Sequence, residues 1–125
     1  LGQELDANSQ KPRDLLLAIK QLGPEVVSIT DGPRGAYAID QDDNCFYIIA
    51  PQTAEKPEKT GAGDAYAAGF FASYLYKNDV PTCMQWGNTI SGNVMRHVGA
   101  QVGLLRRKGL DGEMKNLNNL ETEKI

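Results

Sequence analysis

Residues 55–71 read EKPEKTGAGDAYAAGFF, and the interpretation of the whole chain depends on them. Gly61, Ala62 and Gly63 run directly into Asp64, and an almost wholly apolar stretch follows. Small residues let backbone N–H groups turn toward one point, and a helix start adds unpaired donors and about half a positive charge. Such a place can hold an anion beside a base. An alternative needs no ligand: the glycines form a turn and Asp64 caps the helix.

Two common phosphate-binding patterns do not fit this stretch. A P-loop requires a Gly-Lys-Ser/Thr string, and the chain has none. The dinucleotide-binding pattern requires glycine or alanine where the chain has Tyr66, and it follows a strand rather than a polar loop. What remains is an anion site with an acid next to it.

Length and composition indicate an ordinary globular chain. The 125 residues suggest one domain, 41% of them are hydrophobic and 23% are charged. A net charge of −3 argues against nucleic acid as a partner. No apolar run is long enough for a membrane span, so we expect no membrane partner. Cys45 and Cys83 lack metal-ligand spacing, and we expect reduced thiols in a cytoplasmic protein.

The hydrophobic pattern predicts a mixed α/β order. We expect a helix over 12–22, strands over 25–30, 36–40 and 45–50, helices over 64–77 and 81–98, and a weak helix over 112–121. The helix over 64–77 is apolar on nearly every face, which is typical of burial on all sides. Residues 1–10 and 116–125 are expected to be poorly ordered ends. The start at Leu1 and the small number of strands suggest the C-terminal piece of a longer protein.

Residues 60–70, TGAGDAYAAGF, resemble the C-terminal signature of the ribokinase-like (PfkB) carbohydrate kinases, Asp-Thr-x-Gly-Ala-Gly-Asp-x-Phe-x-x-Gly-Phe. Tyr66 stands where the signature has phenylalanine. Residues 26–40 resemble the family's strand-turn-strand, and 87–101 resemble the helix and Gly-Ala turn that close its nucleotide site. The resemblance covers about residues 11–115. It implies the C-terminal part of a three-layer α/β/α fold, a hairpin followed by two packed helices. Residues 1–125 would be a partial domain without the N-terminal substrate and lid half.

The resemblance also implies roles for individual residues. Asp64 would be the general base, and the backbone of Gly61, Ala62 and Gly63 would form the anion hole for the transferred phosphate. The residues implied along the nucleotide are Thr30, Gly32, Gly35 and Asn88, with Asn88 near the adenine.

Metal ions follow from the same resemblance. Mg²⁺ would arrive with ATP, and a monovalent cation such as K⁺ would lie by Glu58, Thr60, Gly99 and Ala100. The family's Asp-Thr pair is Glu58-Lys59 here, so the chain departs from the pattern at the cation site. Lys59 either replaces part of the cation's charge or is a solvated loop lysine.

The expected function is an ATP-dependent phosphotransferase acting on a hydroxyl of a sugar or nucleoside, and the 125 residues alone are expected to be inactive. One alternative is a non-catalytic nucleotide-binding or interaction module derived from such a kinase. Another is a kinase of the same superfamily that acts on a vitamin precursor. A homodimer of the full-length protein is compatible with the resemblance.

Overall fold

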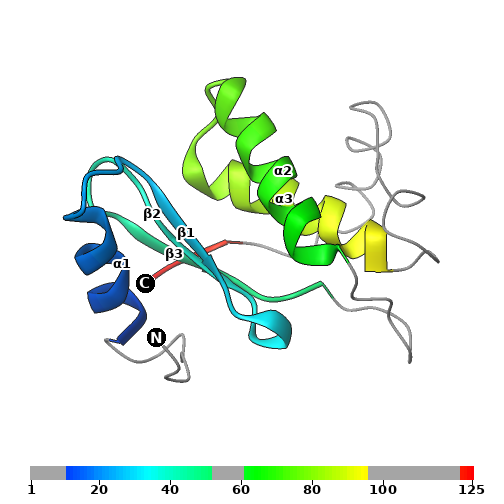
Figure 1. Ribbon diagram of the computed structural model, residues 1–125, viewed down its shortest axis with the longest axis horizontal. Helices are drawn as coiled ribbons and strands as arrows, with labels where there is room; N and C mark the ends of the chain where they lie inside the picture. The colour runs from blue at the N-terminus through cyan, green and yellow to red at the C-terminus, as the bar shows by residue number, and fades with distance from the viewer. Residues whose placement is uncertain (1–10, 52–60, 96–121) are drawn as a thin grey trace.

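The computed structural model describes residues 11–51, 61–95 and 122–125 (Figure 1). Its elements are α1 (Lys11–Lys20), β1 (Val27–Thr30), the 3₁₀ turn η1 (Gly32–Arg34), β2 (Ala36–Ile39), β3 (Cys45–Ile48), α2 (Ala62–Leu75), α3 (Val80–Met95) and β4 (Glu123–Lys124). The predicted order of helix, three strands and two helices is confirmed. The weak helix expected over 112–121 lies outside the described residues.

The described strands form one antiparallel sheet in the order β1-β2-β3-β4. In its register Thr30 lies opposite Ala36, and Ala36 lies opposite Ile48 on the next strand. Strand β4 was not expected from the sequence, which predicted a poorly ordered end over 116–125. Instead, residues 123–124 pair with β3, which extends the sheet beyond the hairpin.

The sheet has a helical layer on each face, as the alternation of β2 shows. Tyr37 and Ile39 pack with Leu16 of α1, whereas the intervening Ala38 packs with Tyr66 of α2 and Met84 of α3. Successive side chains of a strand point to opposite faces, so one short strand serves two cores. Figure 1 shows α1 on one side of the strands and α2 with α3 on the other. The expected three-layer α/β/α arrangement is confirmed.

Helices α2 and α3 approach closely where both carry glycine. A Cβ added to Gly69 would lie 3.0 Å from the Cα of Gly87, and one added to Gly87 would lie 2.8 Å from the Tyr66 ring. The opposite face of α2 is open: Phe71 is 60% exposed and Leu75 65% exposed. The prediction of burial on all sides is therefore wrong for the described part of the chain, because α3 and the sheet cover only the inner face of α2.

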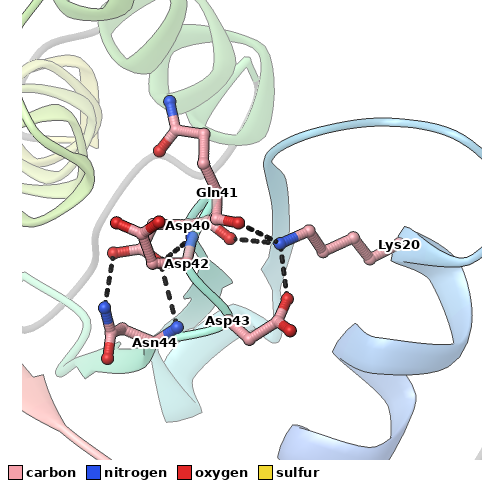
Figure 2. A network of polar contacts seen from close by, with 6 residues as sticks. All are labelled: Lys20, Asp40, Gln41, Asp42, Asp43 and Asn44. Atoms are coloured by element: carbon pink, nitrogen blue, oxygen red, sulfur yellow. Dashed lines mark hydrogen bonds and ion pairs between the residues drawn. The ribbon is translucent and has the colours of Figure 1, made fainter.

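The end of α1 is fixed to the β2–β3 turn by a polar network (Figure 2). The Lys20 ammonium donates to the carbonyl oxygens of Asp40 at 2.6 Å and Gln41 at 2.9 Å, and to Asp43 Oδ1 at 2.5 Å. Within the turn, Asp40 Oδ1 accepts from the backbone N–H groups of Asp42 and Asn44 at 2.9 Å. These bonds fix the length of the hairpin connection and hold α1 against it.

Two further sequence expectations concern the two cysteines and membrane-spanning segments. Cys45 and Cys83 are both buried free thiols. Of the helices that the structure describes, none has the length and apolar character needed to cross a membrane.

Candidate functional site

The start of α2 has the geometry of an anion site. Gly61 is the N-cap residue in the left-handed region, with φ 80° and ψ 0°, and its carbonyl accepts from the Ala65 N–H at 2.9 Å. Ala62, Gly63 and Asp64 therefore form the first helical turn, where N–H groups have no carbonyl one turn earlier to bond. The helix begins two residues before the predicted position. Asp64 lies inside the first turn rather than at the cap, so the interpretation of Asp64 as the capping residue is wrong.

The surface above this turn is open. Gly63 and Asp64 are exposed, and a Cβ added to Gly63 would meet nothing within 4 Å in the described structure. Among residues of the described ranges, the Asp64 carboxylate has no hydrogen-bond or ion-pair partner. A phosphate group fits such a place. It would meet the N–H groups of the first turn, the positive end of the helix dipole and the open space beside Gly63. The first turn of α2 thus places N–H groups without an intrahelical partner and a carboxylate next to each other.

The turn between β1 and β2 carries three of the predicted nucleotide residues. Thr30 is exposed at the end of β1, and Gly32 opens η1 with φ 54°. Gly35 has φ 108°, and a Cβ there would overlap the carbonyl oxygen of Ile48. Glycine at position 35 is accordingly required by the close approach of β3, whether or not a ligand lies nearby.

Two side-chain contacts hold this turn in one shape. The Arg34 guanidinium makes a fork to the Asp31 carboxylate at 2.9 and 3.0 Å. The Tyr47 hydroxyl donates to the Arg34 carbonyl at 2.8 Å. A bidentate pair fixes orientation as well as distance, so the loop presents Gly32 in a defined position.

Asn88 is 4% exposed on α3, and its Nδ2 donates to the Ile49 carbonyl at 2.7 Å. That bond joins α3 to the chain just after β3. Gly35 approaches the same segment, since its added Cβ would lie 3.2 Å from the Ala50 nitrogen. The structure thus brings Gly35 and Asn88 to one end of β3. The contact between Asn88 and adenine stays a prediction.

A polar link under the site was not found from the sequence. The hydroxyls of Tyr66 and Ser28 lie 3.1 Å apart, and Ser28 Oγ donates to the Tyr37 carbonyl at 3.2 Å. Burial raises the pKa of Tyr66 to about 12. The sequence signal that could have indicated this bond is a tyrosine in an otherwise apolar helix, because a buried phenol normally needs a hydrogen-bond partner.

The predicted monovalent-cation residues Glu58, Thr60, Gly99 and Ala100 lie outside the described residues. In the part of the chain that is described, no group of three or more His, Cys, Asp or Glu side chains could hold a metal ion. The described structure therefore leaves the cation site a prediction.

A glycine-capped helix start with an adjoining carboxylate combines N–H groups that can bind an anion with a group that can accept a proton. The chain belongs to the pfkB family of carbohydrate kinases, whose sequence pattern matches residues 2–107. A nucleoside kinase of Methanothermobacter thermautotrophicus is 32% identical over 101 residues, which is 81% of this chain and 32% of that protein. A 2-dehydro-3-deoxygluconokinase of Haemophilus influenzae is 30% identical over 102 residues, 81% of this chain and 32% of the relative.

Solved structures agree on the fold. The nucleoside kinase of Methanocaldococcus jannaschii superposes with a TM-score of 0.66 at 24% identity, covering 74% of this chain and 30% of that one. The ribokinase of Arabidopsis thaliana, solved with ribose and ATP, superposes with a TM-score of 0.72 at 20% identity, covering 82% and 33%. The chain is thus a ribokinase-like α/β fragment. It spans about a third of the length of the relatives it matches.

Proposed function

We propose that the whole protein is an ATP-dependent kinase that transfers the γ-phosphoryl group to a hydroxyl of a sugar or nucleoside. The observation that carries this proposal is the first turn of α2, where N–H groups without an intrahelical partner lie beside the exposed Asp64. Membership of the pfkB family supports the same reaction class.

In the proposed reaction, Asp64 accepts the proton of the acceptor hydroxyl. The hydroxyl oxygen forms a bond to the γ-phosphorus while the bond from that phosphorus to the bridging oxygen breaks, and ADP leaves with the electron pair. Charge on the phosphoryl oxygens is stabilised by the amides of Gly61, Ala62 and Gly63 and by the helix dipole. Phosphoryl transfer depends chiefly on positioning and electrostatics, so a rigid helix start suits this task.

A phosphate group of ATP fits the residues present at this site, and Mg²⁺ would arrive with the nucleotide. The open space above Gly63 admits a phosphate group, and the turn at Thr30, Gly32 and Gly35 would lie along the nucleotide. Mg²⁺ bound to the phosphates would neutralise part of their charge. Asn88 would hold the adenine edge from α3. A monovalent cation beside the anion hole, a cytoplasmic location and a homodimer belong to the same proposal.

The acceptor is a sugar or a nucleoside in this proposal because both kinds of kinase occur among the relatives. Since the chain spans about a third of their length, we expect the purified 125 residues to show little or no transfer. Turnover of ribose, fructose or adenosine by that piece would contradict this.

Asp64→Asn in the whole protein tests the catalytic role. The amide keeps the size of the side chain but cannot accept the proton, so we expect turnover to fall by about 10²–10⁴-fold while ATP binding changes little. The assay is ADP release with a panel of ribose, fructose, 2-dehydro-3-deoxygluconate, adenosine and cytidine. Asp14→Asn is the matched control, because Asp14 is an exposed acid in the first turn of α1.

Full turnover in Asp64→Asn would exclude Asp64 as the base. Binding of ATP by the unaltered whole protein without transfer to any acceptor of the panel would favour the non-catalytic module.

A further inference from the structure

Tyr66 lies directly beneath the proposed site and reaches the sheet with both its ring and its hydroxyl. Tyr66 is 5% exposed, and its ring packs with Ala36, Ala38 and Ile48 of the sheet. The hydroxyl lies 3.1 Å from Ser28 Oγ on β1. Because Ser28 uses its one proton toward the Tyr37 carbonyl, Tyr66 is the donor to Ser28. A continuous chain of hydrogen bonds therefore runs from α2 through β1 to β2.

Helical geometry connects this bond to the proposed base. Residues two apart on an α-helix are separated by about 200° around its axis. When Tyr66 points into the core, Asp64 must therefore point away from it. Tyr66 is indeed buried, and Asp64 is exposed. A rotation of α2 that moved the Tyr66 hydroxyl would therefore move the Asp64 carboxylate in the opposite direction.

Strand geometry connects the same bond to the nucleotide side. Residues two apart on a strand share a face, so Ser28 and Thr30 lie on the face of β1 that meets α2. The rest of the described inner face of α2 offers Gly69 to α3, apolar side chains to its neighbours and, toward the other end of the helix, Ser73, whose Oγ accepts from Asn78 Nδ2 at 2.9 Å. Apolar packing resists separation of two elements more than it resists sliding, whereas a hydrogen bond fixes both distance and direction.

We propose that Tyr66 is a positioning residue, whose hydrogen bond to Ser28 fixes the first turn of α2, and with it Asp64, relative to the β1–β2 turn. The inference rests on the proposed kinase function. Loss of the bond would leave the base and the phosphoryl donor present but less well aligned, which lowers the rate of the chemical step rather than the affinity for ATP.

The experiment is a double-mutant cycle in the whole protein with Tyr66→Phe, Ser28→Ala and the double variant. Tyr66→Phe keeps the ring, and we expect kcat to fall about threefold to tenfold, with KM for ATP within about twofold. Ser28→Ala leaves the Tyr66 hydroxyl buried without its partner, so a larger fall is expected. The double variant removes both groups, and its kcat should return to that of Tyr66→Phe.

Tyr74→Phe is the matched control on the same helix, because within the described residues the Tyr74 hydroxyl makes no hydrogen bond. All rates are divided by the concentration of ATP-binding sites from calorimetry, and unfolding midpoints are measured in urea. A purely structural role would lower the midpoint while kcat per site stayed at the level of Tyr74→Phe, and that result overturns the inference. Additive effects of the two single substitutions on kcat overturn it as well.

Asp64→Asn, assayed in the same way, distinguishes failure of the positioning inference from failure of the proposed kinase function. If Asp64→Asn loses turnover while Tyr66→Phe does not, the positioning inference fails and the proposed function stands. If Asp64→Asn keeps full turnover, the proposed function itself fails.

Discussion

Gly35→Ala would add one methyl group where the chain has no room for it. Gly35 has φ 108° and ψ −151°, a region that residues with a side chain avoid. The new Cβ would overlap the Ile48 carbonyl oxygen and lie 3.0 Å from Cε2 of Tyr47 and 3.2 Å from the Ala50 nitrogen. Two of these three neighbours are backbone atoms, so a rotamer change cannot relieve the clash.

The expected loss of stability follows from two effects. Backbone strain at such a position costs about 1–3 kcal/mol. Moving the end of β3 away would weaken one or two hydrogen bonds near the Ala36–Ile48 pair, each contributing about 1 kcal/mol. We therefore expect the free energy of unfolding to fall by about 2–5 kcal/mol, a large part of the stability of a domain.

Urea unfolding followed by circular dichroism measures this loss. Gly32→Ala is the control three residues earlier, with φ 54° and nothing within 4 Å of an added Cβ. It carries only left-handed backbone strain, about 1–2 kcal/mol. The midpoint for Gly35→Ala should lie below that of Gly32→Ala at an unchanged slope. Equal midpoints would refute the argument that close approach of β3 requires glycine at position 35.

Lys20→Met removes the ammonium that bonds the β2–β3 turn, and we expect a loss of about 1–2 kcal/mol in urea unfolding, against less than about 0.5 kcal/mol for exposed Lys77→Met. A loss equal to that of Lys77→Met would show that the network is not stabilising. Raising the pH tests the burial of Tyr66, whose pKa of about 12 in the folded protein lies above the ordinary tyrosine value of 10.0. Since the folded state holds this proton more tightly, its stabilisation is complete below pH 10 and is lost between pH 10 and 12, by about 2–3 kcal/mol. In Tyr66→Phe the free energy of unfolding should fall correspondingly less over that interval than in the unaltered protein. An identical fall would contradict the raised pKa of Tyr66.

The sequence predicted the elements whose signals are local. β1 and β2 follow from β-branched and aromatic residues on either side of the turn at 31–35, and their positions are confirmed. The start of α2 was placed two residues late because Ala62 and Gly63 resemble turn residues. The left-handed Gly61 is what allows both to be helical, and a sequence does not show backbone angles.

The remaining differences arise from contacts between distant segments. β4 consists of Glu123 and Lys124, a pair without a strand pattern, and it exists through pairing with β3. The hydrogen bond between Tyr66 and Ser28 joins residues 38 positions apart. Composition could show that α2 is apolar all round, but not which face α3 and the sheet would leave uncovered at Phe71.

The Lys20 network also has a consequence for how the hairpin responds to its surroundings. The Lys20 ammonium is surrounded by two carbonyl oxygens and a carboxylate oxygen, which are also ligands for a free cation. Unlike a free cation, the ammonium is part of the chain. Its local concentration is set by the position of Lys20 at the end of α1 and not by the medium, so dialysis or a chelator cannot remove it. Added salt would weaken the attraction to the exposed Asp43 carboxylate more than the two carbonyl bonds. The last turn of α1 and the β2–β3 turn should therefore open together, and hydrogen exchange at their amides should report one opening free energy.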